Sequence, residues 1–486
     1  MLAGASAAMW AAFAQRAPAQ AGGPATIQAL PTLHSNELRF LFDRITNGWN
    51  DAAWTHALAL GHSAWLEEQL DPASIDDSAM DSMLTSFVTL NMTSKQIYDT
   101  YVTTNTTSIP ISELETAAIL RGAYSKRQLL ERMVEFWTDH FNVDHTDGQV
   151  QWLKTTDDRA VIRAHALGNF RDLLLASAQS GAMLYYLDNY RNFAGAPNEN
   201  YAREAMELHT LGVGNYIETD VVGLARCLTG WQYYSQSQPN HGDFRFNASQ
   251  HDNGSKSVLG YTIPAGGGIN DGLQMIDILA THPATAAFLA RKLCRFFLSY
   301  AAPQAIVDRV ANAYLASGAD IKITLRAVLA SSSLAQVPTA SRAKLKRPFY
   351  LTCSMIRACN PTITMASRFV NELALMGHQP LRWATPDGYP DTLEYWGSGV
   401  LARWTFLSKL FNGGINGTSV DVALLFAATP KSQLASKANQ ILCGGSLDPA
   451  DVAAVQSYAD AMATLNNTLR RDVLALSASS PSFQFA

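Results

Sequence analysis

The densest group of chemically capable side chains lies between Asn198 and Trp231, in the stretch NENYAREAMELHTLGVGNYIETDVVGLARCLTGW. Asn198 is a good helix N-cap, and two glycines after Leu211 can close the helix in left-handed conformations. We therefore expect a helix from Glu199 to Leu211. At about 100° per residue, one face of this helix carries Asn200, Arg203, Glu204 and Glu207.

This polar face could perform acid–base chemistry. If Glu204 and Glu207 share a buried environment, their pKa values separate, so that one carboxyl can act as acid and the other as base. Arg203 would be their electrostatic partner, and Asn200 would contact substrate. The spacing of His209 from the two glutamates is not the Glu-x-x-His spacing of carboxylate-bridged iron sites, which disfavours that class.

Two histidines from other segments are candidate catalytic partners of the glutamates. His140 ends a helix that we expect from Ser125 to Phe141, and it is either a hydrogen-bonded core residue or an acid or base. His251 opens the motif HDNGSK, in which Asp252 and Lys256 would contact substrate. The alternative for this motif is a capped turn with a surface lysine.

Aromatic residues gather in and after the loop MGHQPLRWATPDGYP, at residues 376–390. Trp383 and Trp396 could stack on the apolar patches of a sugar or peptide and so contact substrate. They could instead pin the loop to the core, and we leave both interpretations open.

A metal site receives only weak support from the sequence. The acids and amides at Asp188, Asn189, Asn198 and Glu199 would suit a divalent cation such as calcium. Ordinary capping and turn chemistry explains the same residues, and their spacing matches no calcium loop. The cofactor and the metal ligands are therefore left unknown.

The elements that must position these residues are mostly helices. Helical spacing of apolar residues dominates from Ser35 onward, and a helix starting at His282-Pro283 has a basic face around Lys292 that we expect to be solvated or paired. Alternating residues in 243–247 and 257–263 predict a small β-hairpin insertion near residues 240–262. We predict a mainly α fold, with residues 36–486 forming a single large multi-helix domain.

Composition excludes several classes of protein. The chain has 486 residues, of which 48% are hydrophobic and 16% charged, so it can bury a large core. Its net charge of -5 argues against a nucleic-acid partner, and no apolar run is long enough to span a membrane. The five scattered cysteines predict buried thiols and leave one disulfide open. Walker, dinucleotide-binding, HExxH and Gly-x-Ser-x-Gly motifs do not occur.

The amino terminus predicts export. Residues 1–21 form an alanine-rich apolar run ending in Ala-Gln-Ala, the pattern that signal peptidase cleaves, and residues 22–35 read as a flexible leader. The opening resembles the apolar segment that comes after a twin-arginine motif, so the true start could lie upstream. We expect a periplasmic or secreted protein, and the alternative is an amphipathic or disordered tail.

The central stretch resembles the hallmark of a bacterial family catalogued as domain of unknown function 1800. Further segments that fit are EFWTDHFNV at 135–143, HDNGSKSVLG at 251–260, ARKLCRFF at 290–297 and SSPSFQ at 479–484. The resemblance covers nearly all of the chain from about Glu37. It implies an all-helical, exported protein that has no established activity and is often found with a sulfatase-like exported companion.

Three hypotheses about function remain open. The first is a hydrolase-like carbohydrate-active or related envelope enzyme, in which Glu204, Glu207, His140 and His251 act on a glycan or another envelope ligand. The second is a non-catalytic binding or assembly protein of the cell envelope, in which the charged centre is structural. The third is a metal-binding or redox protein. A cleft shared by the glutamates and the two histidines would favour the enzyme.

Overall fold

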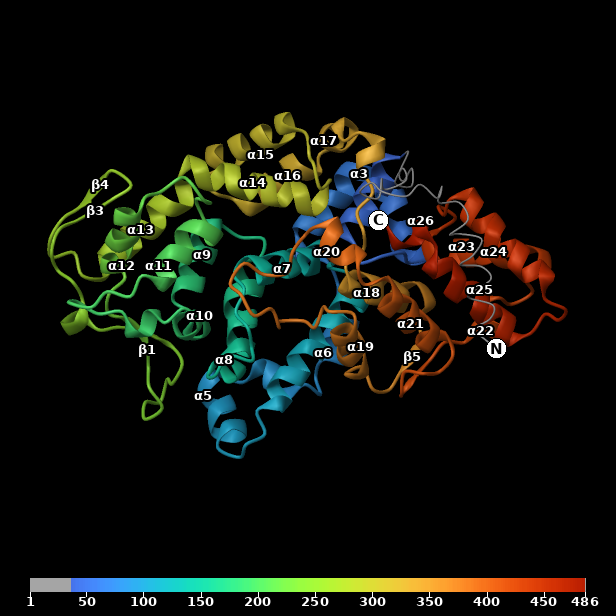
Figure 1. Cartoon of the computed structure of the whole chain (residues 1–486), viewed down its shortest axis with the longest axis horizontal. Coiled ribbons are helices and arrows are strands. Elements are labelled where there is room, and N and C mark those ends of the chain that lie inside the picture. The colour runs from blue at the N-terminus through green and yellow to red at the C-terminus, as the bar shows by residue number, and fades with distance from the viewer. Residues whose placement is uncertain (1–35, 486) are drawn as a thin grey trace, which may run out of the picture.

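A computed structural model describes residues 36–485, so the predicted signal peptide and leader lie outside the described residues. Helices account for 62% of the chain, which confirms the mainly α prediction. Figure 1 shows an elongated arrangement, with the β-hairpins at one end and the carboxy-terminal helices at the other.

The amino-terminal helices surround α7, which carries the candidate residue His140. The expected helix from Ser125 begins three residues later, because Ser125 has extended backbone and its hydroxyl donates a hydrogen bond to Asp77 at 2.6 Å. The helices of this part are α2 (Glu37–Ile45), α3 (Asp51–Leu70), α4 (Ser78–Met83), α5 (Ser94–Ile97), α6 (Ser108–Tyr124), α7 (Gln128–His140), α8 (Val150–Asp157), α9 (Phe170–Ala178) and α10 (Gly181–Tyr186).

The central stretch is a short α-helix that continues as a wider π-helical turn. Helix α11 spans Asn200–Glu204, the π-turn spans Ala205–His209, and α12 follows at Glu218–Cys227. The prediction of one regular helix to Leu211 was therefore wrong in its second half. The hydroxyl of Thr210 bonds to the carbonyl of Ala205 at 2.6 Å, which satisfies one of the backbone groups that the wider turn leaves free.

The predicted β-hairpin insertion is present as two antiparallel hairpins rather than one. They pair β1 (Trp231–Tyr233) with β2 (Phe244–Phe246), and β3 (Lys256–Val258) with β4 (Tyr261–Ile263). The second hairpin closes through Leu259 and Gly260, which both have positive φ, as a two-residue hairpin turn requires. A further pair, β5 (Thr362–Ile363) with β6 (Thr418–Ser419), was not predicted because two-residue strands have no detectable alternation.

The rest of the chain is helical and builds two large hydrophobic clusters. One cluster extends from Phe40 to Val337, and the other joins Ile119 and Ala123 of α6 to residues 351–483. The single-domain organisation stays a prediction. The helices are α13 (Ile269–Thr281), α14 (Pro283–Phe297), α15 (Gln304–Ala316), α16 (Ile321–Leu329), α17 (Ser331–Gln336), α18 (Pro348–Cys359), α19 (Arg368–Leu375), α20 (Leu393–Gly397), α21 (Val400–Phe411), α22 (Val422–Leu425), α23 (Leu434–Cys443), α24 (Pro449–Ala461), α25 (Asn467–Ser479) and α26 (Pro481–Gln484).

Two further predictions concerned the state of the cysteines and the presence of a membrane-spanning segment. All five cysteines are buried free thiols, and burial raises the pKa of Cys227 to about 12. None of the helices within residues 36–485 combines the length and the apolar character needed to cross a bilayer.

Candidate functional site

The chemically most unusual contact lies at the carboxyl end of α7. His140 is buried among the rings of Phe136, Trp137, Phe141, Phe170 and Phe288. Its Nε2 lies 3.0 Å from the carbonyl oxygen of His209, which can only accept, so Nε2 carries the proton. Its Nδ1 then accepts a hydrogen bond from the ammonium of Lys292 at 2.9 Å. Burial and the nearby Lys292 hold the pKa of His140 well below its usual range.

Lys292 belongs to the α14 face that we expected to be solvated or paired. Its part-buried side chain is paired with His140 and lies 5.4 Å from the centroid of the Phe288 ring. Burial lowers the pKa of Lys292 to about 8, although Asp139 and Asp387 act in the opposite direction. A lysine that is partly neutral near physiological pH can serve as a base or a nucleophile.

His209 lies beneath this pair, on the inner side of the π-turn. Burial, reinforced by Lys292, lowers the pKa of its imidazole to about 3. Neither ring nitrogen of His209 has a hydrogen-bond partner within the described part of the chain, and the same holds for the hydroxyl of Tyr201, whose ring centroid is 6.2 Å away. Buried polar groups are normally bonded, so these atoms mark a place where a water or a polar ligand atom fits.

The two predicted glutamates lie together and differ in environment. Burial and the neighbouring Glu207 raise the pKa of Glu204, while Arg203 opposes this shift. Glu207 accepts a hydrogen bond from the hydroxyl of Tyr216 at 2.8 Å. Glu204 is thus the better candidate for an acid, and Glu207 is engaged as a hydrogen-bond acceptor.

Arg203 and Asn200 make their contacts on the outer surface of α11. The guanidinium of Arg203 bonds to Glu218 at 2.9 Å and to Glu199 at 3.3 Å, and its side chain is 36% exposed. Asn200 is exposed, and its backbone N–H donates to the side chain of Asn198 at 3.0 Å. Both residues therefore have structural contacts of their own, and their role toward a substrate stays a prediction.

The aromatic loop at residues 376–390 lies against the end of α7. The amide of Asn142 donates to the carbonyl oxygens of Trp383 and Thr385 at 2.8 Å each, and the indole N–H of Trp383 donates to Asp387 at 3.0 Å. The exposed Asp387 is close enough to act electrostatically on both Lys292 and Glu204. We call five residues the α7 centre: His140, His209 and Lys292, which hydrogen bonds connect, and Glu204 and Asp387, which are related to them by electrostatic interaction alone.

The loop aromatics divide into a buried and a part-exposed set. Trp396 is 3% exposed, and its indole N–H donates to the carbonyl oxygen of Pro390 at 2.6 Å. Tyr389 is also buried and bonds to the backbone of the loop. These contacts favour the pinned-loop interpretation for Trp396, whereas Trp383 keeps part of its ring accessible.

A cavity of about 60 Å³ lies on the other flank of α7. Its wall includes Glu135, Thr138, Asp139, His378 and Tyr389, but not His140 or the two glutamates. Burial raises the pKa of Asp139 to about 6, even though Arg347 bonds to its carboxylate at 2.6 Å. Asp139 is also within electrostatic reach of Lys292, so it connects this cavity with the α7 centre.

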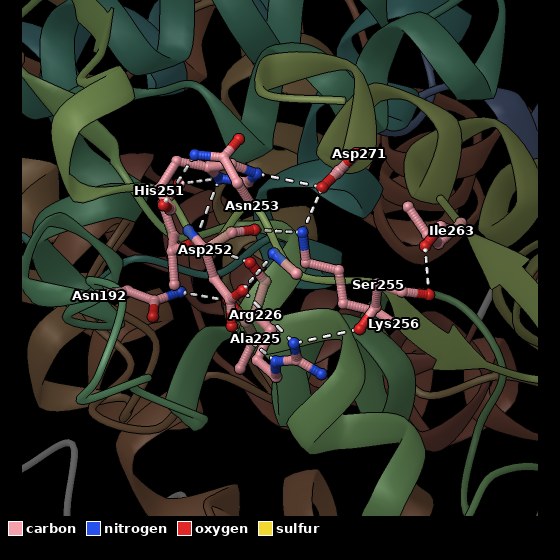
Figure 2. Close-up of polar contacts among 12 residues, drawn as sticks. Asn192, Ala225, Arg226, His251, Asp252, Asn253, Ser255, Lys256, Ile263 and Asp271 are labelled. Atoms are coloured by element: carbon pink, nitrogen blue, oxygen red, sulfur yellow. Dashed lines mark hydrogen bonds and ion pairs between the residues drawn. The ribbon is translucent and has the colours of Figure 1, made fainter. Parts of the chain in front are cut away.

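The HDNGSK motif forms a second network, which connects the β3–β4 hairpin with α12 and α13 (Figure 2). Nδ1 of His251 is 2.8 Å from the carbonyl oxygen of Thr229, and Nε2 is 3.1 Å from the Asp271 carboxylate, which Lys256 also contacts. The side chains of His251 and Lys256 are fully buried. Asp252 accepts a hydrogen bond from Arg226 at 2.7 Å. These contacts hold the hairpin against α12 and α13.

The predicted catalytic histidines belong to two different hydrogen-bond networks. Among residues 36–485, no hydrogen bond or ion pair joins His251 to His140, Glu204 or Glu207. The sequence interpretation missed Lys292, which had a detectable signal: it stands four residues after Phe288 and four before Phe296, on an aromatic stripe. It also missed Asp387, because a loop aspartate carries no such pattern.

The metal alternative rests on residues that have other partners. Asn189 is buried, and its neighbour Asp188 has a left-handed backbone conformation, which aspartate commonly adopts in turns. These residues therefore fit the turn interpretation. Within the described ranges, no group of three or more His, Cys, Asp or Glu residues is placed to hold a metal ion. The cofactor stays unknown.

Comparison with known proteins gives one match. A family model with the description "Protein of unknown function (DUF1800)" matches residues 40–485. No curated protein and no solved structure matches the chain.

Proposed function

Because the chain belongs to the DUF1800 family, whose description assigns no activity, we propose its function from the chemistry of the α7 centre. The proposal is an exported acid–base enzyme that acts on a polyhydroxylated ligand such as an envelope glycan. The observation that carries it is the hydrogen bond from Lys292 to a neutral His140 at 2.9 Å. Export rests on the alanine-rich run at residues 1–21.

Acid–base chemistry needs two groups whose pKa values are shifted toward the working pH. Lys292 has a pKa lowered to about 8 and can accept a proton, whereas Glu204 has a raised pKa and can donate one. Both are within reach of the charge on Asp387. His140 holds the lysine through Nδ1 and is itself fixed through Nε2, so it acts as a positioning residue.

The ligand class is argued from the polar and aromatic groups around the α7 centre. Glu207 and Asp387 supply carboxylate acceptors for hydroxyl groups, and their negative charge disfavours phosphorylated ligands. Trp383 and Tyr186 are part-exposed and offer ring faces for the apolar side of a sugar.

Substitutions with a matched control test the proposal on the purified full chain. A panel of nitrophenyl glycosides and soluble envelope polysaccharide would be the substrates, with released phenol or reducing ends as the readout. Lys292→Met and Glu204→Gln should each lower the rate by about 100-fold or more, as expected when an acid or base is lost. Lys126→Met, which changes an exposed lysine, should leave it unchanged. Equal rates in all three variants would contradict the proposal.

A second candidate function is a non-catalytic binding or assembly protein of the cell envelope. In such a protein the charged centre would have a structural role. The completed network of His251, Lys256 and Asp271 favours this alternative for the hairpin end of the molecule. Retention of envelope polysaccharide without turnover, or co-purification with a sulfatase-like exported companion, would select it over the enzyme.

A further inference from the structure

A small cavity with strongly cationic walls lies at the junction of α2, α7, α14 and the segment before α18. Its volume is about 20 Å³. The charged side chains that line it are Arg44, Arg132, Lys344, Arg347, Asp43 and Asp391. None of them belongs to the α7 centre.

Each of the three arginines around the cavity has one hydrogen-bond donor without an acceptor in the described part of the chain. Arg44, Arg132 and Arg347 are 3%, 6% and 5% exposed, and the Nε of each has no acceptor in the described part of the chain. A guanidinium cannot shed its proton, so each Nε–H remains a buried donor. An unsatisfied buried donor costs about 1–3 kcal/mol, more when it is charged. Three such donors around one cavity indicate a missing acceptor.

At least one terminal nitrogen of each guanidinium group is engaged. Arg44 bonds to the carbonyl oxygens of Leu298 and Arg342. Arg132 bonds to Glu135 at 2.5 Å, and Arg347 bonds to Asp139 at 2.6 Å and to Glu135 at 3.2 Å. The three side chains are therefore fixed in place.

Positive charge exceeds negative charge around the cavity. Four cations and two carboxylates line it, and Asp391 is bonded to Lys344 at 2.7 Å. Including their ion-pair partners, Glu135 and Asp139 as carboxylates and Arg39 as a cation, leaves five cations against four carboxylates, an excess of one. Lys346 is 7% exposed and lies 3.6 Å from the Phe483 ring. Burial lowers the pKa of Arg44 to about 10 and that of Lys344 and Lys346 to about 8.

We propose that this cavity binds a single small inorganic anion of the size of chloride, held by the Nε–H groups of Arg44, Arg132 and Arg347. A space of about 10–15 Å³ holds one water, so the cavity holds one monatomic ion and excludes phosphate and organic acids. A water could accept hydrogen bonds, but it would leave the positive charge uncompensated. The anion would tie α2 and α7 to the segment that begins α18.

Thermal unfolding of the full chain tests the proposal. The protein is prepared in sodium gluconate, whose anion is too large for the cavity, and gluconate is replaced by chloride or bromide at constant ionic strength. The midpoint temperature of unfolding should rise as the halide concentration rises. Well above the dissociation constant, the rise should become proportional to the logarithm of the halide concentration. At a halide concentration 100 times the dissociation constant, the unfolding equilibrium constant should fall about 100-fold.

Two variants and one crystallographic measurement complete the test. Arg44→Gln should lose most of the halide response, whereas Arg326→Gln, which breaks an exposed pair with Glu67, should keep it. If Arg44→Gln does not fold, the wild-type chain crystallised with bromide should show an anomalous peak inside the cavity. Equal midpoints in halide and gluconate, or a cavity without bromide, would overturn the proposal.

Discussion

His140 and Lys292 constrain each other's protonation. The bond between Nε2 and the His209 carbonyl fixes the tautomer, so Nδ1 must be an acceptor, and an ammonium beside it disfavours a second proton on the ring. Both pKa values are lowered chiefly by burial. The pair therefore combines a histidine that stays neutral with a lysine that can titrate.

We predict that His140 remains neutral from pH 5 to pH 8 with its proton on Nε2. Nitrogen-detected NMR of the histidine rings should show this tautomer without a change over that range. In Lys292→Met the pKa of His140 should rise, because the second of the two main causes of its lowering has been removed. A ring that takes up a proton near pH 6.5 in the wild-type chain would contradict the assignment.

The two glutamates should respond differently to neutralisation. The pKa of Glu204 is raised, so its ionised form is disfavoured in the folded state, and Glu204→Gln should leave stability unchanged or increase it above about pH 5. Glu207→Gln weakens the acceptor of the Tyr216 hydroxyl and should cost about 1 kcal/mol. Denaturant unfolding at pH 5 and pH 8 measures both. A larger loss for Glu204→Gln at pH 8 would reverse the assignment of the acid.

At the scale of elements, local sequence patterns predict where a helix lies. They do not predict where a helix becomes irregular. The helix start at Pro283 follows from the capping residue His282 and the proline after it. The π-turn does not, because its register depends on contacts with distant residues. Gly212 after this turn has a φ of 78° and lies against the Phe288 ring of α14.

Two glycines allow the effect of that contact to be measured. A Cβ on residue 212 would lie 2.9 Å from Cδ2 of Phe288, whereas one on residue 214, with a φ of 88°, would meet nothing within 4 Å. Gly214→Ala should therefore cost only the strain of positive φ, about 1–2 kcal/mol, and Gly212→Ala should cost about 1–3 kcal/mol more through overpacking. Urea unfolding of both variants measures the difference, and equal losses would remove the role of Phe288.

At the scale of the whole molecule, hydrophobic patterning predicts the core but not the charges inside it. The segment SRAKLKRP, at residues 341–348, has the composition of a surface turn, yet Lys344, Lys346 and Arg347 are all buried. Their environment is assembled from α2, α7, α14 and α26, which are far apart in sequence. For the same reason the sequence could name His140 and Glu204 but not Lys292, which bonds to His140, or Asp387, which acts electrostatically on Glu204.

Buried histidines should make the folded protein less stable as the pH decreases. Burial is the main cause that lowers the pKa of His140, His209 and His378, so these rings stay neutral in the folded state while the unfolded chain protonates them below about pH 6.5. The unfolded state then binds more protons, so the free energy of unfolding should fall as the pH drops from 6.5 toward 4, by up to about 1.4 kcal/mol per pH unit for each ring.

Asp139 and Glu204 oppose this trend, because their raised pKa values make the folded state bind protons in the same range. Asp147, Asp243 and Asp472 also have raised pKa values, and His62, His241 and His282 have lowered ones, so six histidines face five carboxyls and a net fall is expected. His378 accepts a hydrogen bond from the backbone N–H of Phe349 at 3.2 Å, which the amide oxygen of glutamine can replace. His378→Gln should therefore reduce the slope of stability against pH by one proton, measured by urea unfolding at pH 7, 6 and 5. A slope equal to that of the wild-type chain would mean that His378 is protonated in the folded state at these pH values.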